Sequence, residues 1–133
     1  MPHTIALKIG HQNIHGNGEL KLNHDDLVSK IKSHHIFGAQ ETKLGNNSPC
    51  PDIEGYTKFR SDRKRKGKYI AGGSVLYIKK YIAKGVTKIS SRSNQHGDVI
   101  WVKLDKTFFG LEQNILLCYA YIVPTAELDQ TLL

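Results

Sequence analysis

The chain has 133 residues, of which 39% are hydrophobic and 23% are charged, so it is neither disordered nor fibrous and fits one globular domain or part of one. Its formal net charge of +7 favours an anionic partner, with nucleic acid ahead of an acidic membrane surface. No apolar run approaches the ~18 residues of a membrane span, and the first residues lack a signal-peptide pattern. Cys50 and Cys118 have no metal-ligand spacing. We therefore expect an intracellular protein, nuclear or cytoplasmic, without a membrane partner.

The first part of the chain predicts a strand, a helix and a second strand. Residues 5–13 form the first strand, and alternation places four side chains on one face: Leu7, Ile9, His11 and Asn13. After a turn at residues 16–18, Asn23 is expected to cap a helix that has acidic residues in its first turn. The apolar run at residues 36–42 is then a short buried strand. This βαβ unit brings the ends of its two parallel strands together at Asn13 and Glu41.

The rest of the chain predicts mostly strands. A loop at residues 45–51 precedes a short strand at 55–60, and further strands are expected at 70–78, 98–104 and 114–124. The last of these is the most hydrophobic segment, which indicates a central strand that ends at Pro124. A β-meander therefore follows the βαβ unit. The final residues, 127–133, have the pattern of a helix that is just beginning, which suggests that the chain is cut inside a domain.

The basic segment from residue 60 to residue 68 must lie in a solvated loop, because so many charges cannot be buried. Such a run is either a mobile exposed loop or a set of phosphate contacts, and the overall charge leaves both readings open. Its candidate nucleic-acid-binding residues are Arg60, Arg63, Lys64, Arg65, Lys66 and Lys68.

Three polar side chains lie at or near the ends of strands that the pattern predicts to be buried: Asn13, Glu41 and Tyr121. In open α/β sheets ligands bind at such ends. Taken alone, Glu41 is either an ion-paired loop residue or a ligand of a hard metal ion, since Mg2+ prefers one or two carboxylates with water and phosphate oxygens.

Four segments in the same order resemble the endonuclease/exonuclease/phosphatase superfamily, above all the apurinic-endonuclease-like domain of LINE-type retrotransposons. They are Gln-Asn-Ile-His-Gly at residues 12–16, Gln-Glu-Thr at 40–42, Gly-Gly-Ser-Val at 72–75 and Tyr-Ile-Val-Pro at 121–124. The resemblance covers residues 5–124. The family usually has a second proline where Val123 stands, so Tyr119 competes with Tyr121 for the role of the family's tyrosine.

The resemblance implies a Mg2+ site, with Mn2+ as a substitute, that cleaves phosphodiesters, with DNA favoured as the substrate. Glu41 matches the family's metal-binding glutamate, Asn13 the asparagine that supports metal and phosphate, and Tyr121 the tyrosine that hydrogen-bonds the scissile phosphate. The family's later Asp-x-Asn and Ser-Asp-His segments do not occur here. Residues 1–133 then correspond to the N-terminal half of a four-layered α/β sandwich, truncated before its C-terminal catalytic half.

On this reading the partner sheet is missing. We therefore expect a chain that is inactive alone and that is marginally folded, associates with itself through the unpaired sheet face, or is a truncated gene product.

Three alternatives remain. The basic segment is also consistent with a non-catalytic nucleic-acid-binding module, whose affinity falls with salt and ignores Mg2+. A phosphoinositide or lipid phosphatase-like member of the same superfamily shares these first motifs. His11 and His15 flank Asn13 at a spacing that makes a transition-metal site conceivable, although no cysteine or carboxylate completes it.

Overall fold

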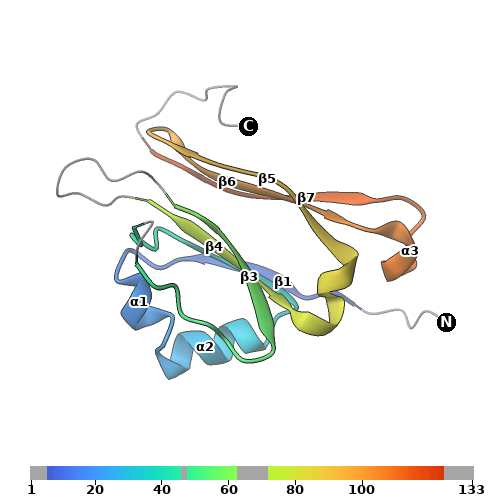
Figure 1. Cartoon of the computed structure of the whole chain (residues 1–133), viewed down its shortest axis with the longest axis horizontal. Helices are drawn as coiled ribbons and strands as arrows, with labels where there is room; N and C mark the ends of the chain where they lie inside the picture. Colours follow the sequence, from blue (N-terminus) through green and yellow to red (C-terminus); the bar gives the residue numbers. More distant parts are fainter. Residues whose placement is uncertain (1–5, 46–47, 63–71, 125–133) are drawn as a thin grey trace.

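The computed structural model describes residues 6–45, 48–62 and 72–124 and shows an α/β protein with two facing sheets (Figure 1). The first sheet has the strand order β1-β2-β4-β3, and the second has the order β5-β6-β7. The strands are β1 (Ile9–Asn13), β2 (Ile36–Gln40), β3 (Tyr56–Ser61), β4 (Ser74–Lys79), β5 (Val86–Asn94), β6 (Gly97–Leu104) and β7 (Ile115–Ile122).

Helices cover only one face of the first sheet in Figure 1, so the described layers run helix, sheet, sheet. These helices are α1 (Gly18–Lys21) and α2 (Asp25–Lys32). A 3-10 helix, η1 (Lys80–Gly85), connects the two sheets, and the short α3 (Lys106–Phe109) lies between β6 and β7. No helix in the described part of the chain is long and apolar enough to cross a membrane.

The predicted βαβ unit is confirmed, because β1 pairs with β2 in parallel and Asn13 lies opposite Gln40. The predicted cap of its helix is wrong. The N-cap of α2 is His24, whose Nδ1 accepts the N–H of Asp26 at 3.3 Å. Asn23 instead donates from its side chain to the carbonyl of Glu19 at 2.8 Å, and so satisfies a backbone acceptor of α1, a helix that the sequence did not predict.

Strand β4 lies between β2 and β3 and is antiparallel to both. It begins at Ser74, later than the predicted start at residue 70, although residues 70 and 71 lie outside the described part. Gly72 and Gly73 precede it with φ of 65° and 86°, a left-handed conformation that glycine adopts without strain. Ser74 pairs with Gln40, which places this glycine turn beside the end of β2.

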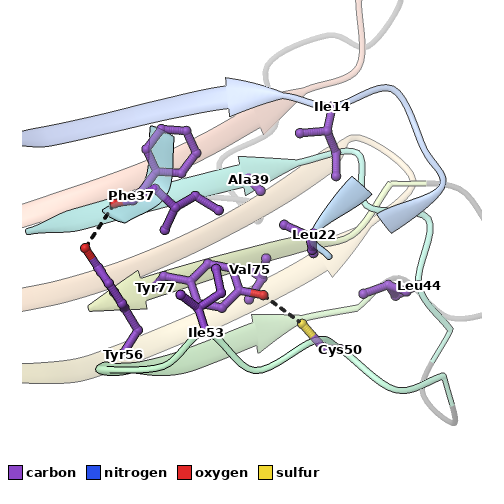
Figure 2. Close-up of a cluster of buried hydrophobic side chains, with 11 residues drawn as sticks. Ile14, Leu22, Phe37, Ala39, Leu44, Cys50, Ile53, Tyr56, Val75 and Tyr77 are labelled. Carbon is purple, nitrogen blue, oxygen red and sulfur yellow. Dashed lines mark hydrogen bonds between the residues drawn. The ribbon is translucent and has the colours of Figure 1, made fainter. Parts of the chain in front are cut away.

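Two apolar cores lie on the two faces of the first sheet. One packs Phe37 and Tyr77 against helix residues such as Ile31 and against the loop at Cys50 (Figure 2). The other fills the space between the sheets, where Ile36, Leu76 and Ile78 of the first sheet meet Ile100, Val102 and Tyr119 of the second. The expectation of a missing partner sheet is therefore wrong.

The predicted strands at 98–104 and 114–124 are β6 and β7, whereas β5 was missed because it carries little apolar alternation. Most of its residues are polar and at least partly exposed, so the sequence gives no strand signal there. The predicted central position of the last strand also differs from the structure, because β7 lies at the edge of its sheet among the residues that the structure describes. Of its apolar residues, Leu116 is 62% exposed and Ile115 is 42% exposed, while Tyr119 is buried. The hydrophobic residues of β7 reflect the contact of one of its faces with the first sheet. They do not indicate the position of the strand within its own sheet.

Candidate active site

The second sheet places β7 directly over β2. The ring of Tyr119 lies against Gly38, where an added Cβ would come within 2.4 Å of the ring. Two residues further on, Gln40 Nε2 donates to the carbonyl of Ala120 at 2.8 Å. Because β2 and β7 run in the same direction, both strands end at the same end of the sandwich, on the left in Figure 1. Glu41 follows β2 directly and Tyr121 lies near the end of β7, so both belong to this end.

Glu41 is the centre of a cluster of polar groups. A hydrogen bond from the Tyr121 hydroxyl is the largest cause that lowers the pKa of the Glu41 carboxyl, and a hydrogen bond from Asn13 lowers it further. Partial burial opposes this change, while the charges of His15 and Lys43 add to it. His15 Nδ1 lies 3.4 Å from Glu41 Oε2, and the Glu41 side chain keeps 20% of its surface exposed. The carboxylate is therefore held ionised, oriented and open to a ligand.

The two candidate tyrosines lie in different surroundings. Tyr121 hydrogen-bonds Glu41, whereas the Tyr119 hydroxyl is buried between the sheets without a hydrogen-bond partner in the part of the chain that the structure describes. Burial raises the pKa of Tyr119 well above its ordinary value. Tyr119 therefore packs in the core between the sheets, whereas Tyr121 joins the polar cluster at Glu41.

The backbone after β2 is held by the glycine turn before β4. The N–H of Thr42 donates to the carbonyl of Gly73 at 3.1 Å, and that of Lys43 donates to Gly72 at 2.7 Å. The N–H of Gly73 in turn donates to Asp98 Oδ2 at 3.0 Å. Because Glu41 and Lys43 have φ of 55° and 54°, this segment is strained and depends on these contacts.

Sequence reasoning assigned no role to Asp98, which is fully buried and also accepts a hydrogen bond from the hydroxyl of Ser93. A carboxylate that opens an apolar strand was the available signal, since a buried acid requires partners. His15 was considered only with His11 for a transition-metal site. The structure pairs it with Glu41 instead, and no group of three His, Cys, Asp or Glu side chains that could hold a metal occurs among the described residues.

A groove of about 490 Å3 opens beside Asn13 between the end of β1 and α2. Two ammonium groups are held at its walls. Lys30 Nζ donates to Gln12 Oε1 at 2.7 Å, and the Lys21 ammonium donates to the carbonyl of Ile14. The lining residues are Gln12, Asn13, Ile14, His15, Lys21, His24, Asp26, Leu27 and Lys30.

Of the residues predicted to bind nucleic acid, only Arg60 is described. Its guanidinium donates to the carbonyls of Ser48 and Gly45 at 2.9 and 3.1 Å and pairs with Asp62 at 3.1 Å. Arg60 thus holds the loop before β3, and its predicted contact with nucleic acid stays a prediction. The others, Arg63, Lys64, Arg65, Lys66 and Lys68, lie outside the described residues.

The donors at this site fit part of a Mg2+ site. Glu41 offers one accessible carboxylate whose orientation is fixed by Tyr121 and Asn13. A hard cation that keeps several waters and takes phosphate oxygens needs only one or two such carboxylates from the protein. No protein-family model matches the chain, and no curated protein matches it in sequence.

Proposed function

We propose that this chain carries the glutamate-bearing part of a Mg2+-dependent site for phosphodiester hydrolysis, with nucleic acid, and DNA in particular, as the substrate. The observation that carries this proposal is the convergence of Asn13 and Tyr121 on the Glu41 carboxylate, from three strands far apart in sequence. Residues 1–133 are then the N-terminal part of an endonuclease/exonuclease/phosphatase-like domain, and the two sheets are the inner layers of its four-layered sandwich. An intracellular location, nuclear or cytoplasmic, accompanies such a substrate.

Each residue has a defined task in this proposal. Mg2+, or Mn2+ in its place, supplies a Lewis acid that stabilises charge on phosphate oxygens. Glu41 holds the ion. Asn13 and Tyr121 orient the carboxylate through hydrogen bonds, and the Tyr121 hydroxyl has the further proposed task of directing a phosphate oxygen. His15 adds a hydrogen-bond donor at the open side of the site, where its side chain is 77% exposed.

The same geometry supports a chain that binds but does not cut by itself. Hydrolysis also requires a group that activates water in line with the leaving oxygen. Asp98, which lies near the site, is fully buried and engaged by Gly73 and Ser93, so it is not available as that base. We therefore propose that cleavage needs residues beyond those described here.

Binding of a polyanion is supported by the charges around the site. The net charge is +7, and Lys21 and Lys30 line the groove that begins at Asn13. A phosphate backbone that enters the site can follow this groove, since lysine side chains neutralise phosphates without sequence preference.

A metal-binding experiment tests the proposal directly. Binding of Mn2+, followed by its electron paramagnetic resonance signal and by competition with Mg2+, should be lost in Glu41→Gln and kept in Glu112→Gln, an exposed acid before β7. Equal binding by both variants would overturn the assignment of Glu41. Plasmid nicking is measured in parallel at low salt, and we expect none from the native chain. Nicking that disappears in Glu41→Gln would keep the site and refute its inactivity.

The alternative of a non-catalytic nucleic-acid-binding module rests on the lysine-lined groove and the basic segment. It predicts DNA affinity that falls steeply with salt and is the same with Mg2+ and with a chelator. Release of phosphate from phosphoinositides, lost in Glu41→Gln, would instead favour the phosphatase-like alternative.

A further inference from the structure

The loop that follows β1 places an imidazole ring beside the Glu41 carboxylate. His15 Nδ1 lies 3.4 Å from Glu41 Oε2, and most of the His15 side chain is exposed. In the proposed function Glu41 holds the metal ion and His15 takes no part in holding it. Imidazole is nonetheless a common ligand of Zn2+ and other transition-metal ions, whereas Mg2+ takes oxygen ligands. The identity of the ion at this site therefore depends on whether the imidazole also binds it.

Backbone hydrogen bonds on both sides of His15 hold it next to Glu41. The N–H of Gly16 donates to the carbonyl of Glu41 at 2.6 Å. On the other side, the N–H of Ile14 donates to the carbonyl of Gln40 at 2.9 Å. His15 and Glu41 themselves have φ of 57° and 55°, a left-handed conformation that costs free energy in residues other than glycine. The backbone therefore brings the two side chains together at some cost to the stability of the loop.

The distance between the two ligand atoms favours a tetrahedral ion. Ligand atoms bonded at about 2.1 Å lie about 3.4 Å apart around a tetrahedral Zn2+ and about 3.0 Å apart around an octahedral Mg2+. The separation of 3.4 Å between His15 Nδ1 and Glu41 Oε2 equals the tetrahedral value. It is also longer than a charged hydrogen bond between a nitrogen and a carboxylate, which measures about 2.8 Å. The two side chains are thus placed as a pair of ligands.

We propose that His15 Nδ1 and Glu41 Oε2 together bind a tetrahedral transition-metal ion, Zn2+ in particular, in preference to Mg2+. The inference rests on the proposed function, because Glu41 is a metal ligand in both, and it adds a second ligand and the class of the ion. The positions of the ion that these two ligands do not fill are open to water and a phosphate oxygen. The charge of Lys43, which also acts on Glu41, opposes every divalent cation alike and does not change the preference.

A metal competition experiment on the full chain tests this inference. Bound Mn2+ is followed by its electron paramagnetic resonance signal, and Zn2+ or Mg2+ is added to displace it. Zn2+ should displace Mn2+ from the native chain at a concentration roughly tenfold or more below that of Mg2+. His15→Asn removes the imidazole, and asparagine tolerates the left-handed backbone at this position. This variant should bind Zn2+ roughly tenfold or more weakly, because it lacks a direct ligand, and should bind Mg2+ as the native chain does.

A matched control and a second readout accompany the competition. His11→Asn makes the same chemical change at another exposed histidine, in β1, and should leave both affinities unchanged. Co2+ then replaces Zn2+, because tetrahedral Co2+ absorbs visible light far more strongly than octahedral Co2+. The native chain should give the strong spectrum, and His15→Asn should lose it. The spectrum of the native chain reports the coordination without any substitution.

The outcomes separate this inference from the proposed function. Loss of Mn2+ binding in Glu41→Gln, together with a native preference for Zn2+ in His15→Asn, would overturn the inference and leave the proposed function standing. Mn2+ binding that Glu41→Gln keeps would overturn both. Equal losses of Zn2+ and Mg2+ in His15→Asn would mean that His15 only orients the carboxylate. That result, a weak Co2+ spectrum from the native chain, or loss of Zn2+ binding in His11→Asn would each overturn the inference.

Discussion

Gly38→Ala tests whether the contact of Tyr119 with β2 sets the spacing between the two sheets. The added methyl group would lie 2.4 Å from Cδ1 and 2.7 Å from Cε1 of the Tyr119 ring, far inside van der Waals contact. Tyr119 is 7% exposed, and its hydroxyl lies in the core, so the ring has no free space into which to turn. The sheets must therefore separate or the ring must leave its rotamer.

The expected magnitude follows from two opposing effects. Overpacking a dense core costs about 1–3 kcal/mol. Replacing glycine by alanine returns about 0.4–1 kcal/mol, because the unfolded chain becomes less flexible. The free energy of unfolding should therefore fall by roughly 1–2 kcal/mol. With a urea dependence of about 1–3 kcal/mol per molar, the midpoint of urea unfolding moves down by about 0.3–2 M.

A double-mutant cycle separates this contact from a general effect on the strand. Tyr119→Leu removes the ring, so Gly38→Ala should cost much less in that background, with a coupling of about 0.5–3 kcal/mol. The same change should weaken the contact between Glu41 and Tyr121, since the spacing of β2 and β7 sets it. A native urea midpoint for Gly38→Ala, or additive effects in the cycle, would refute the reasoning.

Three further substitutions test the site and the turn that supports it. Tyr121→Phe should raise the pKa of Glu41, because the hydrogen bond that lowers it most is lost. The lowered pKa stabilises the native chain above the ordinary value of 4.5, and this stability is lost as the pH falls through the native pKa, so the variant should lose less stability in acid than the native chain. Carboxyl NMR titration and acid unfolding measure these two effects, and an unchanged titration of Glu41 would contradict the prediction. Asp98→Ala should lower the free energy of unfolding by about 2–3 kcal/mol, because the buried N–H of Gly73 loses its acceptor. Asp98→Asn keeps an acceptor and should lose less stability. Equal urea midpoints for the two variants would count against Asp98 as the acceptor that supports the turn. Gly73→Ala should lower the melting temperature more than Gly55→Ala. Both glycines have a positive φ, 86° and 83°, but only at Gly73 would the new Cβ meet another atom, Thr42 Oγ1 at 2.6 Å. Equal shifts of the melting temperature in calorimetry would mean that backbone strain is the whole effect.

The sequence predicted those features that depend on neighbouring residues. The parallel pairing that joins Asn13 to the end of β2 follows from a strand, a helix and a strand in succession, because such a unit has one favoured hand. Alternation likewise placed Tyr119 and Tyr121 on one face of their strand. It did not decide between them, because the depth of each ring depends on where β2 lies beneath the second sheet.

The features that sequence reasoning missed all depend on contacts between distant segments. Strand β5 is polar and is a strand because β6 pairs with it. The sequence around Asp98 does not show that this carboxylate accepts the N–H of Gly73, which lies 25 residues earlier in the chain. His24 replaces Asn23 as the cap of α2 because a short helix before it uses the Asn23 side chain.

The local character of the second sheet has a consequence for the order in which the protein folds. Its three strands follow one another in sequence. Asn94 and Gly97 are joined by only two residues, and β6 and β7 are joined by residues 105–114, so both hairpins close between neighbouring segments. Hairpins of this kind form in about 1–10 μs. The first sheet pairs Ile36 with Ile78, and the bond from Gln40 to Ala120 spans 80 residues. Glu41 and Tyr121 therefore meet only after both sheets have closed, which makes the polar cluster among the last parts of the native structure to form.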